Sequence, residues 1–247
     1  MIRIGGQLFA HRGLHSPGGP PENSIESFLA AEQGGYGIEL DVRLTRDGEL
    51  AVIHDADTGT TTEESMIVEQ SRYGELKELS LGGTESRIPT LGGVLEALRP
   101  TTPLLVEVKP SPSQSECAAK VVEVVSPRLG STAVQSFHPA VVRRVKKDSP
   151  RLLVGQIGGI APEIASELST SEKLFLTTLF TNPWAKPDFL SLEISYLTSP
   201  PARFWRRVLG CAVLAWTIRD SAAYAKSREL HAGTIFDGFR PTAVALD

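Results

Sequence analysis

The clearest hydrophobic pattern in the chain lies in residues 37–55, where apolar and charged residues alternate. The apolar positions are Ile38, Leu40 and Val42, and the charged positions are Glu39, Asp41 and Arg43. Alternation with a period of two predicts a strand whose charged side chains share one face. Asp47-Gly48 then predicts a tight turn, and residues 50–53 predict an antiparallel return strand, because a two-residue turn cannot connect parallel neighbours. The hairpin thus carries His54 back beside the carboxylates.

Short apolar runs recur along the chain and predict further strands, separated by helical patterns. The expected strands are residues 8–10, 38–43, 104–109, 132–137, 152–157, 189–194, 213–218 and 234–239. Eight strands alternating with helices in 247 residues favour a single α/β domain, a (β/α)8 TIM barrel over residues 1–247. A doubly wound open sheet is the alternative. It is less favoured because no glycine-rich phosphate loop follows the first strand.

Several helices carry recognisable signals at their first residues. Asn23 can cap a helix, with Glu26 three residues later in the capping-box position. Thr90 can cap a short helix and Asp220 the final one, while Pro139 suits the first turn of another.

Residues 56–89, which follow the hairpin, show no clear period. They are rich in Thr, Glu, Ser and Gly and contain few apolar anchors. We therefore expect an insertion, partly helical near residues 71–79, that lies beside the carboxyl ends of the strands as a partial lid. Loops at this face of a barrel usually carry specificity, and this one is expected to be the most mobile part of the chain.

Composition narrows the class of protein. Hydrophobic residues make up 41% of the chain and charged residues 22%, as in ordinary soluble globular proteins. A net charge of −4 gives no reason to expect a nucleic-acid partner. No segment has the length of a signal peptide's apolar run or of a membrane helix, so we expect a cytoplasmic protein without stable membrane insertion. Cys117 and Cys211 have no metal-type spacing and are expected to be buried thiols.

Polar residues gather where the expected strands end. They are His11, Glu39, Asp41, Glu107, Lys109, Ser136, Trp216 and Asp237. Any one of them alone would more often be an ordinary loop or cap residue. Active sites of (β/α)8 barrels are built from several strand ends at once, so their joint placement predicts one site.

The residue types in this set indicate the chemistry. Three carboxylates from two neighbouring strands suit a hard divalent cation, Mg²⁺ or Ca²⁺, rather than zinc. Two histidines from different segments suit a general acid and a general base. Arg12 and Lys109 are fixed cations that could clamp a phosphate. Together these groups favour phosphodiester chemistry, and Ser136, with no histidine partner in sequence, is not expected to be a nucleophile.

The chain resembles the glycerophosphodiester phosphodiesterase family, within the phosphatidylinositol phospholipase C-like superfamily. The matching motifs span most of the chain in the family's order. They are H-R-G at 11–13, E-N-S at 22–24, E-L-D-V at 39–42, L-T-R-D-G-E-L-A-V-I-H-D at 44–55, V-E-V-K at 106–109, Q-S-F at 135–137, A-W-T-I at 215–218 and F-D-G-F-R-P at 236–241.

The resemblance implies a role for each matching residue. It makes Glu39, Asp41 and Glu107 metal ligands for Mg²⁺ or Ca²⁺, and His11 and His54 the acid–base pair. It places Arg12 and Lys109 on the substrate phosphate, with Phe137 and Trp216 lining the substrate pocket.

The activity implied by the resemblance is metal-dependent hydrolysis of glycerophosphodiesters to glycerol 3-phosphate and an alcohol. Two alternatives are a related lipid phosphodiesterase, of the lysophospholipase D or sphingomyelinase D kind, and a catalytically inactive metal-binding barrel. A membrane-active enzyme should carry an exposed apolar or basic loop, which residues 56–89 lack.

Among the remaining histidines, His15 is expected to be solvated, His138 to begin a helix and His231 to be a surface cation late in a helix.

Overall fold

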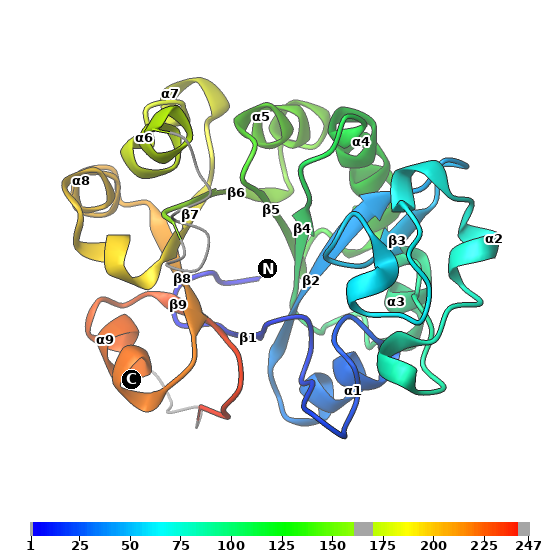
Figure 1. Ribbon diagram of the computed structural model, residues 1–247. Coiled ribbons are helices and arrows are strands. Elements are labelled where there is room, and N and C mark those ends of the chain that lie inside the picture. The colour runs from blue at the N-terminus through cyan, green and yellow to red at the C-terminus, as the bar shows by residue number, and fades with distance from the viewer. Residues whose placement is uncertain (1, 161–169, 242–247) are drawn as a thin grey trace.

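Eight parallel strands close into a barrel in the computed structural model, which describes residues 2–160 and 170–241 (Figure 1). The barrel strands are β1 (Leu8–Ala10), β2 (Gly37–Leu44), β4 (Leu104–Val108), β5 (Thr132–Ser136), β6 (Leu153–Gly158), β7 (Phe189–Glu193), β8 (Ala212–Ile218) and β9 (Gly233–Phe236). β1 pairs with both β9 and β2, which closes the sheet. The predicted TIM barrel is confirmed, and the open-sheet alternative is excluded.

The hairpin predicted around the most regular stretch of sequence is present. β3 (Leu50–Val52) pairs antiparallel with the end of β2, in the register Val42 with Val52 and Leu44 with Leu50. Gly48 has a φ of +85°, a left-handed conformation that glycine adopts without steric cost. The hairpin extends the barrel wall beyond the level where β1 ends, and it carries His54 to the carboxyl-terminal face.

Helices surround the barrel on the outside in Figure 1. They are α1 (Ile25–Gln33), α3 (Leu91–Ala97), α4 (Gln114–Val125), α5 (Pro139–Asp148), α6 (Thr170–Thr178), α7 (Asn182–Ala185), α8 (Pro200–Arg207) and α9 (Ser221–Glu229). Thr90 and Asp220 cap α3 and α9 with their side chains, and Pro139 is the first residue of α5, as predicted. The prediction that Asn23 caps α1 is wrong. Ser24 accepts the capping hydrogen bond from the Ser27 backbone N–H, and Asn23 points elsewhere.

Short 3₁₀ segments complete the described structure. They are η1 (Thr58–Thr60), η2 (Val68–Gln70), η3 (Leu81–Gly83), η4 (Ser126–Arg128) and η6 (Ile194–Thr198). None of the helices in the described ranges is long and apolar enough to cross a membrane. Both cysteines are free thiols, with Cys117 buried as expected and Cys211 partly exposed. Burial raises the pKa of Cys117 to about 12 and that of Cys211 to about 11.

The inward-facing side chains of the barrel form an apolar layer below a polar one. Because side chains alternate along a strand, each inward apolar residue is followed two positions later by another inward residue. The pairs are Leu105 and Glu107, Ala133 and Gln135, Phe189 and Ser191, and Leu214 and Trp216. Ile2 and Ile4 pack against the apolar layer from the amino-terminal end of the strands. The polar layer therefore lies on a closed hydrophobic floor, at the carboxyl ends of the strands.

The insertion in residues 56–89 packs against the hairpin in a small hydrophobic core separate from that of the barrel. Its helix α2 (Tyr73–Leu76) falls within the segment expected to be helical. The buried residues of this core are Ala51, Ile53, Val68, Leu76, Leu79, Leu81 and Ile88. The expectation of few apolar anchors is wrong, because the anchors are spread singly along the segment and form no period. Arg43 of β2 also holds the insertion through an ion pair with Glu69 at 2.9 Å. The mobility of the segment stays a prediction.

Gly155 of β6 offers a test of how tightly the barrel interior is packed. A Cβ at this position would lie 2.2 Å from the ring of Phe189 on β7. Gly155→Ala should therefore lower the free energy of unfolding by about 1–3 kcal/mol, as overpacked cores do. Gly74→Ala is the matched control, because nothing lies within 4 Å of that added Cβ. Denaturant unfolding of both variants measures the effect, and equal stability of the two would contradict the packing argument.

Candidate active site

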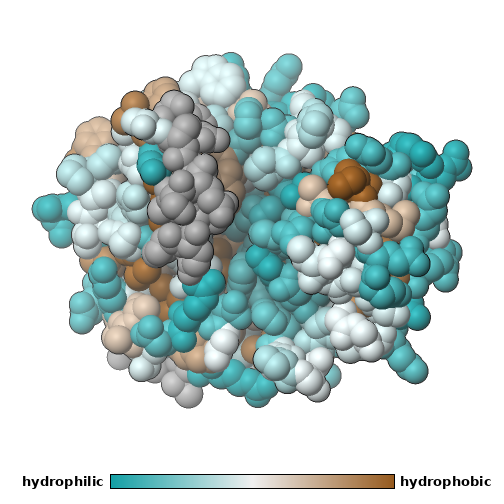
Figure 2. Space-filling view, viewed as in Figure 1, coloured by the Kyte–Doolittle hydropathy of each residue, from teal (hydrophilic) through white to brown (hydrophobic). Residues whose placement is uncertain are grey.

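A cavity of about 440 Å³ lies at the carboxyl ends of the barrel strands. Figure 2 shows a hydrophilic hollow near the middle of this face. The nine residues to which the family resemblance assigns roles all line the cavity, and they are His11, Arg12, Glu39, Asp41, His54, Glu107, Lys109, Phe137 and Trp216. Ser136 and Asp237, the other two strand-end residues predicted at the site, do not line it. The structure thus brings the predicted residues together, while their chemical roles stay predictions. The insertion contributes no lining residue to this cavity, and its role as a partial lid stays a prediction.

Three buried carboxylates form the acidic centre of the cavity. β2 turns Glu39 and Asp41 inward because they are two residues apart, and its register with β4 sets Asp41 beside Glu107. One oxygen of each carboxylate lies within 4.8 Å of the others. Glu39 and Asp41 are each only 1% exposed and Glu107 is 6% exposed. An all-oxygen donor set of this kind could hold a hard divalent cation.

The electrostatics of the three carboxylates show why a cation fits there. Burial, together with repulsion from Asp41 and Glu107, raises the pKa of Glu39 well above its ordinary value. Burial alone would also raise the pKa of Asp41, but Lys109 and the cations around it hold that pKa below its ordinary value. The protein's own cations therefore stabilise one carboxylate and leave Glu39 as an unfavourable charge. A divalent ion would relieve that cost.

Two cations are tied to the acidic centre. Lys109 Nζ lies 2.7 Å from Glu107 Oε1 and 3.5 Å from Asp41 Oδ1. Arg12 donates from its Nη1 to Glu22 at 2.8 Å, and its backbone N–H donates to Glu39 Oε2 at 3.2 Å. Both cations were expected to contact a substrate phosphate. They line the cavity, yet in this structure their partners are carboxylates.

Each of the two histidines has a carboxylate on its Nδ1 side. His54 Nδ1 lies 2.6 Å from Asp55 Oδ1, and Thr60 donates to the other oxygen of Asp55. His11 Nδ1 lies 3.5 Å from Asp237 Oδ2. When a carboxylate takes Nδ1, Nε2 becomes the nitrogen available to a reactant, which is the arrangement that acid–base histidines use. Burial lowers the pKa of His54 and so favours its neutral form.

Several polar residues in or around the cavity were missed from the sequence. Asn23 is 2% exposed and donates from Nδ2 to Asp41 Oδ2 at 3.0 Å, so it orients a carboxylate instead of capping α1. The E-N-S motif was the available signal. Gln135 and Ser191 line the cavity from β5 and β7, and no sequence signal marked Ser191. His15, expected to be solvated, instead lies with its Nε2 3.2 Å from Asp237 Oδ1.

One wall of the cavity is aromatic. The rings of Phe137 and Trp216 meet edge to face, with centroids 5.8 Å apart. Six buried polar atoms of the lining residues have no hydrogen-bond partner within the described ranges. Those of His11, Arg12 and Glu107 belong to ion pairs, whereas Gln135 Oε1, Ser191 Oγ and Trp216 Nε1 have no such partner among the described residues. Buried polar groups normally find partners, so these atoms mark places where a ligand with hydroxyl or oxyanion groups can bind.

The ion pair of His15 with Asp237 should make stability depend on pH. The carboxylate of Asp237 accepts a hydrogen bond from the His15 ring and so raises the pKa of His15. The stabilisation is therefore complete below the unfolded-state pKa of about 6.5, and it is lost as the pH rises through the raised value. His15→Ala should cost about 1 kcal/mol more at pH 5.5 than at pH 9. Denaturant unfolding at both values measures this. His231→Ala is the control, because its exposed ring forms no ion pair with any described residue, and a pH-independent cost of His15→Ala would contradict the prediction.

Comparisons with known proteins agree with the fold and the motifs. The model of the glycerophosphoryl diester phosphodiesterase family matches residues 11–237. A putative glycerophosphodiester phosphodiesterase of Bacillus subtilis is 36% identical over 158 residues, a match that covers 59% of this chain and 63% of that protein. A glycerophosphodiester phosphodiesterase of Caldanaerobacter subterraneus is 35% identical over 170 residues, covering 63% of this chain and 69% of the relative. The match to the first relative thus spans less than two thirds of its length.

Solved structures extend the similarity over nearly the whole chain. A phosphodiesterase of Oleispira antarctica, solved in complex with the product sn-glycerol-3-phosphate, has a TM-score of 0.76 at 25% identity and covers 93% of this chain and 92% of its own. A glycerophosphodiester phosphodiesterase of Thermotoga maritima has a TM-score of 0.72 at 24% identity, with 96% and 95% covered, and supports the fold.

Proposed function

The chain belongs to the glycerophosphoryl diester phosphodiesterase family, and we propose from this premise that it hydrolyses glycerophosphodiesters to glycerol 3-phosphate and an alcohol with a divalent cation. One observation carries the proposal. Three carboxylate oxygens within 4.8 Å of one another share a cavity with two histidines, each of which has a carboxylate on its Nδ1 side. Hydrolysis of a phosphodiester requires neutralisation of the phosphate charge and two proton transfers. The carboxylates, with a bound cation, would supply the first, and the histidines the second.

Glu39, Asp41 and Glu107 would hold the cation, Mg²⁺ or Ca²⁺. When bound, it would neutralise phosphoryl charge and polarise the ester. Asn23 keeps Asp41 oriented through its hydrogen bond, so the donor oxygens are positioned before an ion arrives. Arg12 and Lys109 lie beside the acidic centre and supply positive charge for the oxygens of a phosphate.

The two histidines move protons. One takes the proton from the attacking hydroxyl, either water or the glycerol 2-hydroxyl, and the other gives a proton to the departing alkoxide. Attack by the 2-hydroxyl forms a cyclic phosphate, which water then opens to glycerol 3-phosphate. Asp55 holds the ring of His54 at Nδ1, and the carboxylate of Asp237 lies 3.5 Å from Nδ1 of His11, so Nε2 of each ring is left for the reaction. Phe137 and Trp216 form an apolar wall against which the carbon skeleton of a substrate can pack.

A product assay tests the activity and its substrate class. We expect purified protein with Mg²⁺ or Ca²⁺ to release glycerol 3-phosphate from glycerophosphocholine or glycerophosphoethanolamine, followed by phosphorus NMR. Lysophosphatidylcholine and sphingomyelin are included as lipid substrates in the same assay. Turnover of the lipids alone would favour a lipid phosphodiesterase. No turnover of any of the four, with either ion, would indicate an inactive barrel.

A further inference from the structure

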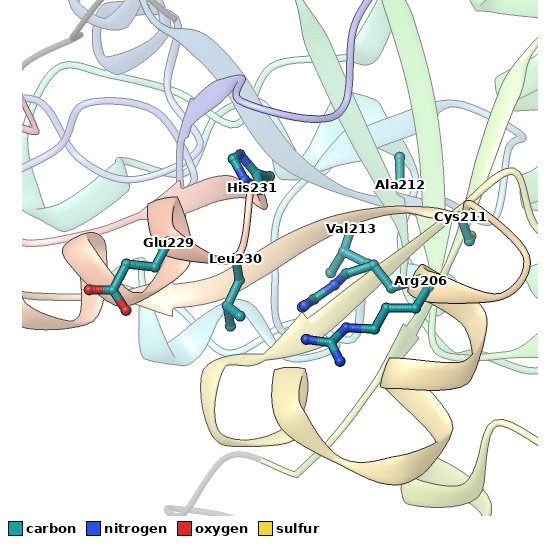
Figure 3. A pocket seen from close by; sticks show the side chains of 8 residues that line it. Arg206, Cys211, Ala212, Val213, Glu229, Leu230 and His231 are labelled. Carbon is teal, nitrogen blue, oxygen red and sulfur yellow. The ribbon is translucent and has the colours of Figure 1, made fainter.

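A second cavity, of about 470 Å³, lies beside the starts of β8 and β9 (Figure 3). Its residues come from the end of α8, the start of β8 and the segment between α9 and β9. They are Arg206, Arg207, Cys211, Ala212, Val213, Glu229, Leu230 and His231. Because the barrel strands are parallel, the starts of β8 and β9 lie on the amino-terminal face, away from the acidic centre.

The arginines around this cavity have no carboxylate partner among residues 2–160 and 170–241. Among the described residues, no carboxylate oxygen lies within 4 Å of the guanidinium of Arg203, Arg206 or Arg207. Arg206 donates one hydrogen bond from its side chain to a described residue, at 3.4 Å to the Leu197 carbonyl. Figure 3 shows the carboxylate of Glu229 pointing away from Arg206. The last turn of α8 therefore presents uncompensated positive charge to the cavity.

Helix electrostatics explain only part of this arrangement. Basic residues in a last turn interact favourably with the helix dipole, and isolated surface arginines need no further account. Here Arg206 and Arg207 line one cavity whose wall includes the apolar residues Ala212, Val213 and Leu230. Burial, followed by repulsion from Arg207 and Arg203, lowers the pKa of Arg206. Neighbouring cations repel one another, and a bound anion would reduce that repulsion.

We propose that this cavity is a binding site for a phosphate group, presented by a small phosphomonoester or by a lipid head group. A guanidinium group can donate two parallel hydrogen bonds to the oxygens of a phosphate. Two adjacent arginines match the charge of a phosphate dianion better than that of a monovalent carboxylate. His231 adds a nitrogen at the edge of the cavity. The site is separate from the proposed catalytic centre and does not depend on that function.

The surroundings of the cavity bear on where the phosphate comes from. Three large apolar side chains beside the arginines are exposed: Phe204 by 52%, Val208 by 67% and Leu209 by 53%. Exposed apolar and basic residues on one short segment are typical of helices that lie at an anionic membrane surface. A lipid head group is therefore one source of the phosphate, and a soluble phosphomonoester is the other.

Binding of inorganic phosphate tests the site directly. In a titration at constant ionic strength, we expect saturable shifts of the Arg206 and Arg207 Nε–H signals in NMR spectra. The double variant Arg206→Gln/Arg207→Gln should bind phosphate at least roughly tenfold more weakly at this site, followed through the backbone amides of Cys211 and His231. Arg151→Gln, which removes an exposed arginine before β6, is the matched control and should titrate like the wild type.

Vesicle sedimentation separates the two sources. Vesicles of phosphatidylcholine with phosphatidic acid are compared with vesicles of phosphatidylcholine alone. If the source is a lipid, the wild type sediments with the acidic vesicles only. The double variant Phe204→Ser/Leu209→Ser should then lower the sedimented fraction without changing the phosphate titration. If the source is soluble, phosphate binds and neither vesicle does. Non-saturable shifts, shifts that chloride reproduces, or equal phosphate affinity in the double arginine variant would overturn the proposal.

Discussion

Replacing Glu39 or Glu107 with Gln is expected to remove divalent-ion binding and turnover together. Removing a residue that hydrogen-bonds to a metal ligand typically lowers metal affinity or activity by about 10–100-fold. Removing a ligand itself should therefore lower both by at least roughly 100-fold. Excess EDTA should likewise abolish turnover of the wild type, and Mg²⁺ or Ca²⁺ should restore it. Isothermal titration with each ion and the product assay measure the two effects.

Thermal unfolding adds a readout that does not depend on activity. An ion that binds only the folded protein raises its melting temperature. We therefore expect Mg²⁺ or Ca²⁺ to raise the melting temperature of the wild type and to have much less effect on Glu39→Gln. Without an ion, Glu39→Gln should be at least as stable as the wild type, because it removes a buried charge whose pKa is already raised by burial and by its neighbours.

Glu193→Gln is the matched control for these variants. Glu193 is also a buried glutamate at the carboxyl end of a barrel strand, 6% exposed, but it bonds to Ser195 and does not line the cavity. It should leave ion affinity unchanged. Full turnover of the wild type in EDTA after exhaustive dialysis, or the same loss of affinity in Glu193→Gln as in Glu39→Gln, would contradict the metal assignment.

The acidic centre could be predicted from sequence because its geometry is local. Glu39 and Asp41 share a face whenever their segment is a strand, and the hairpin returns His54 to the same end whatever the rest of the chain does. Their meeting with Glu107 needed only the further assumption of neighbouring parallel strands. Short-range rules of strand and turn geometry were therefore sufficient for the centre of the site.

The contacts that the sequence did not reveal are those that depend on loops and on tertiary packing. Asn23 has a φ of 52°, so the chain turns before α1 and sends its side chain to Asp41 rather than to the helix. His15 meets Asp237 across 222 residues of sequence, a contact with no local signal. Helix α8 was missed: it begins with Pro200 and Pro201, and only Ala202 of its eight residues is buried.

Replacing His54 or His11 with Ala is expected to cut turnover by roughly 100-fold or more while leaving divalent-ion affinity nearly unchanged. Loss of a positioned general acid or base costs about 10²–10⁴-fold, and the carboxylates that would hold the ion remain in place. The wild-type pH profile should be bell-shaped, and each variant should lose one limb. Turnover, ion titration and pH profiles of the two variants measure this.

His138→Ala separates a catalytic role from a structural one. His138 caps α5 by accepting a hydrogen bond from the Ala140 backbone N–H, and it does not line the cavity. Its removal should cost about 1 kcal/mol of stability, as loss of a helix cap does, and leave turnover intact at low temperature. His54→Ala should instead cost little stability and cut turnover. The His54 ring lies at the end of a hairpin, and its Nε2 is the nitrogen left to reach a reactant. A His54→Ala protein that melts early yet turns over normally in the cold would refute the proton-transfer role.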